Sequence, residues 1–310
     1  MELRQERDFG QKINATFQFA AENWRAMLNS LLVLVLPLSM IQGVVSALQQ
    51  ASLQRSIREN AADIPDLKPG DIEGIIQLYS KMFSSMASSQ YVIIGALVGV
   101  LAQVLLAMTI NAFMLAYIEQ KEDSANWSFK KTNAPDITLE QVLNIIKKHF
   151  VAVFFSRFVI ILALILSLIA FVFPFFYFVL PLSVFPTIII MAEDKGIFES
   201  ISRSVSLISG KWWSTFGLLL VIGICYSLMS LIFTIPVGLM SLTEAGNSET
   251  SLAYITVMAI ATGLSSLLLS LIYIATNFQY FNLVERKEGA SLFKPSNPSQ
   301  ANTPEREEEY

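Results

Sequence analysis

The chain has 310 residues, of which 54% are hydrophobic and 15% are charged, and its formal net charge is −4. Soluble domains carry about 25% charged residues, so this composition offers too little polar surface for a protein surrounded by water. It excludes a disordered chain, and the acidic balance excludes a nucleic-acid-binding protein. One Cys and one His exclude a disulfide framework and most metal sites built on these residues. The composition predicts a multi-pass membrane protein.

Five apolar runs are long enough to cross a bilayer, which takes about 20 helical residues. The third run, residues 151–192, has about twice that length and must hold two helices. Its break is expected near Phe171–Pro174, because Pro174 has no N–H and disfavours a helical residue before it. The sequence therefore predicts an all-α integral membrane protein with six transmembrane helices. They cover residues 30–50, 91–118, 151–171, 174–192, 212–240 and 253–280.

These spans form one predicted membrane domain over residues 1–283. Residues 51–90 make an insert on the outer side, in which Asp71 is expected to cap a helix. The apolar face of that helix contains Ile72, Ile75, Ile76, Tyr79, Met82, Phe83 and Met86. Residues 284–310 are polar, acidic and rich in Pro, and are predicted to form a disordered cytoplasmic tail.

The distribution of Lys and Arg predicts the orientation of the spans. With the N-terminus in the cytoplasm, the inner segments hold 16 basic residues and the outer segments hold 4. Positive charge gathers on the cytoplasmic side of membrane proteins, so both termini are expected inside. An even number of spans agrees with this orientation.

The segments before the first, third and fifth spans share one pattern. Each places apolar residues at i, i+4, i+7 and i+11 on one helical face and ends in an aromatic residue. This predicts three units, at residues 9–118, 138–192 and 196–282, each an interfacial helix followed by a helical hairpin. The alternative is that any multi-pass protein has amphipathic segments leading into its spans. The four positions are Ile13, Phe17, Ala20 and Trp24; then Leu139, Leu143, Ile146 and Phe150; then Ile201, Val205, Ile208 and Trp212.

Ionisable residues inside spans are the usual sign of function in membrane proteins, and this sequence has almost none. Arg157 is the exception, and it lies close enough to a span end to reach the interface. Asn111 and Asn277 fall near the cytoplasmic ends of their spans. Together with Arg157 they are a candidate polar pocket that opens inward, although amides in spans more often bridge helices. No catalytic residue, metal ligand or cofactor site is predicted.

A candidate interfacial anchor helix lies before the fifth span. Its apolar residues are expected to sink into the interface, and its basic residues to face anionic headgroups, with about 1 kcal/mol for each. The anchor residues are Lys195, Ile197, Phe198, Ile201, Arg203, Val205, Ile208, Lys211 and Trp212.

The anchor lies within the run EDKGIFESISRSVSLISGKWW, residues 193–213. This run resembles a loose group of bacterial six-span proteins. The group includes the membrane domain of some glycerophosphoryl diester phosphodiesterases and related uncharacterised families. The N-terminal DFGQKINATFQFAAENW is similar to the lead-in helix of such proteins from Bacteroidota. The resemblance implies a helical module of the bacterial inner membrane, without the phosphodiesterase activity, which belongs to a separate soluble barrel.

Two hypotheses about function follow. The first is a non-catalytic scaffold or subunit of a complex in the inner membrane, with membrane lipids and other membrane proteins as partners. The second is a transporter, channel or lipid-handling protein that uses the candidate polar pocket. A lipid-filled cavity open to one side favours the second hypothesis, and a filled bundle favours the first. We expect no enzymatic activity.

Overall fold

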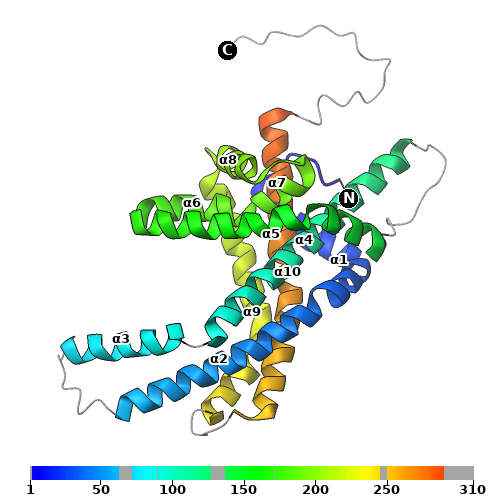
Figure 1. Ribbon diagram of the computed structural model, residues 1–310. Helices are drawn as coiled ribbons and strands as arrows, with labels where there is room; N and C mark the ends of the chain where they lie inside the picture. The colour runs from blue at the N-terminus through cyan, green and yellow to red at the C-terminus, as the bar shows by residue number, and fades with distance from the viewer. Residues whose placement is uncertain are drawn as a thin grey trace.

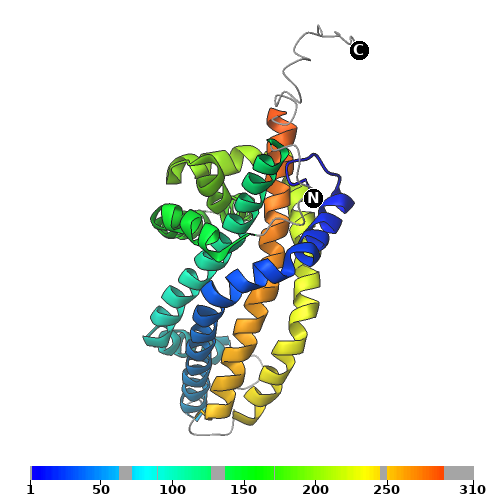
Figure 2. The ribbon, with the colours of Figure 1, turned by 90° about the vertical axis from the view of Figure 1, so that its right-hand side faces the viewer.

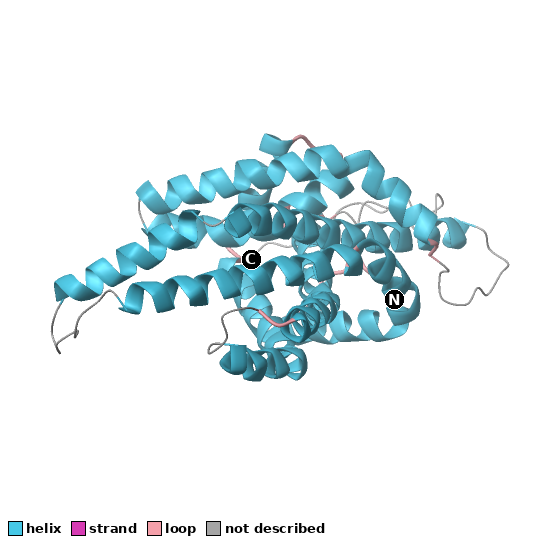
Figure 3. Cartoon of the chain, turned by 60° about the horizontal axis from the view of Figure 1, so that its bottom comes forward, coloured by secondary structure: helices cyan, strands magenta, loops and turns pink. Residues whose placement is uncertain are grey.

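The computed structural model describes residues 2–62, 72–88, 90–126, 137–170, 172–244 and 250–289, and within these residues every regular element is a helix (Figures 1 and 3). The helices are α1 (Phe9–Leu34), α2 (Leu36–Ala62), α3 (Ile72–Ser88), α4 (Gln90–Asn126), α5 (Leu139–Ala170), α6 (Val172–Val184), α7 (Pro186–Glu193), α8 (Ile197–Ile208), α9 (Trp212–Glu244) and α10 (Leu252–Glu288).

The helices confirm an all-α membrane protein with several spans. Five segments are long and apolar enough to cross a bilayer by themselves, and the bent pair α1–α2 raises the number to six. The five are Gln90–Lys121, Leu139–Ile169, Pro174–Glu193, Trp212–Glu244 and Leu252–Glu288.

The first predicted span, residues 30–50, contains a sharp bend. α1 ends at Leu34 and α2 begins at Leu36, and the two helices meet at 53°. Pro37 lies just after the break. It can donate no N–H, and its ring crowds the carbonyl four residues earlier, so the chain bends here. The lead-in segment is thus one continuous helix with the start of the span.

Proline also divides the third apolar run. α5 ends at Ala170 and α6 begins at Val172, as predicted for the break near Phe171–Pro174. A second break follows at Phe185, before Pro186 opens α7, so the span predicted at 174–192 consists of two helices.

The α5–α6 pair runs in its own direction. In Figure 1 both helices run horizontally while α9 and α10 run vertically, and Figure 2 views the same pair nearly end on. Both helices lie in the half of the molecule that also contains α8. Long apolar side chains of α5 remain exposed along this pair, among them Leu162 at 58% and Ile169 at 76%.

α2 and α10 approach each other closely at glycine. A Cβ added to Gly43 would lie 2.6 Å from the Cα of Ala259 and 2.7 Å from the carbonyl oxygen of Met258. A Cβ added to Gly263 would meet side chains of α2 instead, at 2.8 Å from Met40 and 2.9 Å from Leu36. Small residues let membrane helices pack backbone to backbone, and here they set the α2–α10 distance.

The main core surrounds the second half of α10. Phe19 of α1, Phe113 of α4 and Phe278 of α10 are fully buried, and the ring of Phe19 packs edge-on against both others at 6.2 and 5.9 Å. The buried side of α1 is centred on Phe19, beside the predicted face of Ile13, Phe17 and Ala20, which packs on a smaller cluster with α9. Trp24, the last member of that face, is 51% exposed.

The three predicted repeat units differ in the structure. A separate helix before the span is seen at α8–α9, where Gly210 turns the chain with φ 76°. In the first unit the lead-in segment is continuous only with the start of the span, and in the second the lead-in segment and the span form one helix, α5. Equivalence of the three units therefore stays a hypothesis.

The predicted helix of the insert is confirmed as α3, and its described apolar side chains, such as Ile76 and Tyr79, are exposed. Asp71 and residues 290–310 of the predicted tail lie outside the described residues. α10 continues to Glu288, so it extends past the domain boundary predicted at residue 283.

Candidate functional site: a charged cluster at the end of α10

A tight turn between α7 and α8 positions the cluster. Asp194 ends α7 in the left-handed conformation with φ 54°, and Gly196 begins α8 in an extended conformation. The side chain of Glu199 accepts a hydrogen bond from the backbone N–H of Gly196 at 3.4 Å, which satisfies one free donor of the helix start. The turn directs Glu193, at the end of α7, toward α8 and α10.

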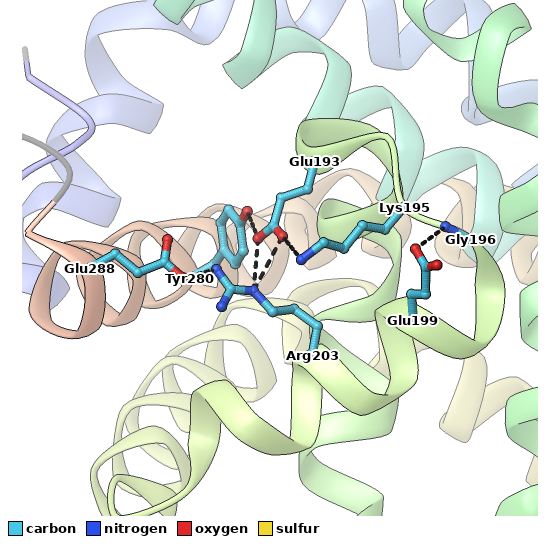
Figure 4. Close-up of polar contacts among 7 residues, drawn as sticks. All are labelled: Glu193, Lys195, Gly196, Glu199, Arg203, Tyr280 and Glu288. Carbon is cyan, nitrogen blue, oxygen red and sulfur yellow. Dashed lines mark hydrogen bonds and ion pairs between the residues drawn. The ribbon is translucent and has the colours of Figure 1, made fainter.

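Glu193 is the centre of the cluster (Figure 4). Its carboxylate accepts a hydrogen bond from the Tyr280 hydroxyl at 2.7 Å and lies 2.7 Å from the Lys195 ammonium. The Nε of Arg203 lies 3.2 Å from both carboxylate oxygens. The side chain of Glu193 is 17% exposed, so these contacts compensate the loss of most of its hydration.

Arg203 extends the cluster along α10 through an ion pair with Glu288. Burial lowers the pKa of Arg203, but the hydrogen bond to Glu288 and the charge of Glu193 outweigh burial, and the net pKa is raised. Arg203 therefore stays charged at any pH at which the protein is folded. It joins the end of α7, α8 and the last turn of α10.

A hollow of about 380 Å³ opens beside the cluster. Its charged side chains are three basic and three acidic groups, so it presents no excess of either sign. The hollow is lined by Arg4, Ala192, Glu193, Lys195, Arg203, Tyr280, Phe281, Val284, Glu285 and Glu288.

Asp194 connects the same turn to the start of α5. The Lys148 ammonium lies 2.6 Å from its carboxylate, and the Nδ1 of the buried His149 lies 3.5 Å away. The hydrogen bond from Lys148 lowers the pKa of Asp194, so the carboxylate remains ionised in mildly acidic solution. Three segments far apart in sequence thus meet at residues 193–203.

A second polar contact lies deeper, at the start of α9. Lys12 of α1 is 3% exposed and donates a hydrogen bond to Gln279 of α10 at 2.8 Å. The amide nitrogen of Gln279 donates to the Thr215 hydroxyl on α9 at 2.7 Å. One amide thus joins three helices, as expected for amides in apolar spans.

The N-terminal segment closes over the end of α10. Leu3 is buried, and the guanidinium of Arg7 lies 5.1 Å from the centre of the Phe278 ring. Asn282 donates to the carbonyl oxygen of Arg7 at 3.0 Å, and Arg286 pairs with Glu6. The first residues of the chain and the end of its last described helix therefore lie at the same end of the molecule (Figure 1).

The three residues of the candidate polar pocket lie in different surroundings. Asn277 is fully buried, and its amide nitrogen donates to the sulfur of Met114 at 3.1 Å. Asn111 is 3% exposed within α4, next to core residues of the same helix. Arg157 donates instead to the carbonyl oxygen of Ser183 on α6 at 3.3 Å.

The candidate anchor residues also separate into groups. Lys195 and Arg203 pair with Glu193 within the chain. Phe198 is 76% exposed and Lys211 is exposed. Ile197, Ile201, Val205 and Trp212 are half-buried, and Ile208 is fully buried.

Sequence reasoning missed Glu193, Tyr280 and Glu288 as parts of a site. Glu193 did carry a signal, because it opens the run that resembles other six-span proteins. Its partners on α10 lie more than 80 residues away, and no local pattern connects such positions.

Within the described ranges, no group of three or more His, Cys, Asp or Glu side chains is placed to hold a metal ion. No family model, no curated protein and no solved structure matches the chain. The arrangement of charged and polar side chains at the end of α10 is therefore the basis for an argument about function.

Proposed function

We propose that the chain is a non-catalytic scaffold or subunit of a membrane complex in the bacterial inner membrane, with both termini in the cytoplasm. One observation supports this proposal above others. The polar side chains of α10, such as Gln279, Tyr280 and Asn282, make hydrogen bonds to other parts of the same chain. They contribute to holding the bundle together, which is what a rigid scaffold requires.

The exposed apolar surface of the α5–α6 pair supports the same proposal. Phe155, Leu162, Leu166 and Ile169 of α5 are each about half exposed or more, and the pair runs away from the α9–α10 pair. Apolar surface of this extent is covered by lipid or by another membrane protein. We infer that part of it is the contact surface for a partner span.

Site-specific photocrosslinking in the intact membrane tests the proposal. A photoreactive residue at Phe155 or Leu162 of α5 is expected to give a protein adduct of constant mass. The matched control is Leu228 on α9, which is 63% exposed and is expected to give lipid adducts. Lipid adducts alone at all three positions would contradict the proposal.

The alternative, a transporter or channel, has less support. Its pocket required Arg157, Asn111 and Asn277 to line one cavity, whereas Asn277 and Arg157 contact different helices. Flux of small solutes through the purified protein in vesicles, lost on replacement of Arg157 by Gln, would favour the alternative.

The resemblance to the bacterial six-span group remains part of the proposal. It rests on residues 193–213, and the structure gives this run a physical role. Glu193 and Arg203, ten residues apart, join α7 to α8. We infer that proteins with this run share the same turn.

A further inference from the structure

An apolar groove opens where α6 passes the start of α9. It is lined by Phe176, Tyr177, Trp212 and Trp213 and has a volume of about 530 Å³. Ligand pockets in proteins measure roughly 300–1,000 Å³, so this groove is large enough for part of a small molecule or a lipid chain.

Trp212, one wall of the groove, is held in position by contacts within the protein. The indole N–H of Trp212 donates to the carbonyl oxygen of Tyr177 at 3.1 Å and so connects α9 to α6. The Trp212 ring also stacks on Phe216 with 5.3 Å between ring centres and 12° between planes. Because the polar atom of this indole is used within the protein, the groove offers aromatic faces, and Trp213 is 77% exposed beside them.

A basic residue lies next to the groove along the chain. Lys211 directly precedes Trp212, is exposed, and has no carboxylate partner in the part of the chain that the structure describes. Lys211 and Arg286 both lie close enough to the buried Lys12 for their positive charges to repel it. Arg286 itself pairs with Glu6. A ligand with a negative group next to an apolar chain therefore matches both features of this region.

The position of the groove indicates which ligand has this chemistry. The apolar span Trp212–Glu244 begins at the groove, so the aromatic rings lie where α9 enters the bilayer. Lipid headgroups occur at this level, and acyl chains begin directly below them. We propose that the groove binds the acyl chain of an anionic phospholipid whose phosphate contacts Lys211. This site does not depend on the scaffold function proposed above.

Quenching of tryptophan fluorescence by brominated lipid tests the site. The double variant Trp24→Phe/Trp127→Phe leaves the two groove tryptophans as the reporters, because the chain contains four. The full chain is placed in vesicles of phosphatidylcholine and phosphatidylglycerol in which one or the other lipid carries dibrominated acyl chains. We expect phosphatidylglycerol to bind about fivefold more strongly, which corresponds to about 1 kcal/mol for one lysine near the membrane surface.

Charge variants separate this site from general attraction to the membrane. In the same double-variant background, Lys211→Gln is expected to reduce the ratio of phosphatidylglycerol to phosphatidylcholine binding to nearly one. Lys211→Arg is expected to keep this ratio at about five. The matched control is Lys147→Gln, which removes an exposed cation on α5 and is expected to leave the preference at about fivefold.

Three results would overturn the site. One is equal quenching by the two brominated lipids in the double variant. Another is an equal loss of preference in Lys147→Gln and Lys211→Gln, which would indicate a diffuse surface charge. The third is weak quenching by both lipids, which would indicate that a protein, such as a second copy of the chain, covers the groove.

Discussion

At the end of α7, the carboxylate of Glu193 contacts side chains from three places: the following turn, α8 and α10. Hydrogen bonds to a charged group contribute roughly 1.5–3 kcal/mol each when they are shielded from water, and this carboxylate is mostly buried. Loss of its negative charge leaves the positive charges of Lys195 and Arg203 with less nearby negative charge to balance them. The stability of this end of the bundle is thus expected to depend on this residue.

We expect Glu193→Gln to lower the free energy of unfolding by roughly 1–3 kcal/mol, because the neutral amide retains its shape but loses the charge-assisted contacts. Thermal unfolding of the protein in detergent measures the change. Glu199→Gln is the matched control, since Glu199 is exposed and contacts the backbone N–H of Gly196. Equal melting temperatures for the two variants would argue against a central role for Glu193.

Gly43 gives a second prediction for a single residue. A methyl group there meets the backbone of α10 at 2.6 Å, so Gly43→Ala must push two helices apart, at about 1–3 kcal/mol. Gly223 on α9 has nothing within 4 Å of the same added atom, and Gly223→Ala is expected to be neutral or stabilising. Thermal unfolding of both variants checks the pair, and a destabilised Gly223→Ala beside an unchanged Gly43→Ala would contradict the packing described for α2 and α10.

Single residues also show what the sequence could predict. Gln279 was expected to bridge helices as an amide in an apolar segment, and it does so. The Glu193–Tyr280 contact could not be predicted, because it depends on how α7 and α10 pack after both have formed. Local chemistry is visible in a sequence, whereas pairing between distant segments is set by tertiary packing.

At the scale of elements, proline determines where helices end. The break near Phe171–Pro174 was predicted from Pro174, and the break before Pro186 has the same cause. Pro37 lies inside the first predicted span, where a proline interrupts the helix, but the sequence did not predict the angle between the two parts. Hydropathy measures length and composition, and it contains no information about direction.

The bend between α1 and α2 can be tested by a distance measurement. Spin labels on Cys residues at Ala21 and Ile57, in a Cys225→Ser background, report the angle between the helices. With 1.5 Å of rise per residue, a 53° bend brings these positions roughly 5 Å closer than a straight helix would. We expect Pro37→Ala to lengthen the distance toward the straight value, and Pro236→Ala in α9 to leave it unchanged. An unchanged distance in Pro37→Ala would show that packing against α10 maintains the bend.

At the scale of the whole molecule, the predicted sides of the membrane correspond to the two ends of the structure. The N-terminal segment, α8 and the end of α10 lie at one end, and α3 and the beginning of α10 lie at the other (Figure 1). The alternation of predicted spans assigned these segments to two sides, and the count of basic residues then predicted which side is cytoplasmic, which stays a prediction. The direction of the α5–α6 pair was beyond such reasoning, because Leu139–Ile169 and Pro174–Glu193 both have the length and composition of crossing segments.

Labelling with a thiol reagent that cannot cross membranes tests this arrangement in intact cells. In a Cys225→Ser background, Cys at Ile76 of α3 is expected to react from outside, whereas Cys at Glu6 reacts after lysis. Cys at Ile169, near the end of α5, is expected to remain unlabelled from outside, because α5 runs roughly perpendicular to the direction of α9 and α10. Rapid labelling of Ile169→Cys from outside would show that this pair crosses the bilayer in the cell.

The contact between Glu6 and Arg286 has a consequence for synthesis on the ribosome. The two residues are 280 positions apart, so the segment around Glu6 has no binding site until the ribosome has made α10. Until then Leu3 and Arg7 have no helix end to cover, and the nascent N-terminus is open to proteases and targeting factors. Completion of the last helix thus ends this exposure and makes the first residues a late step of assembly.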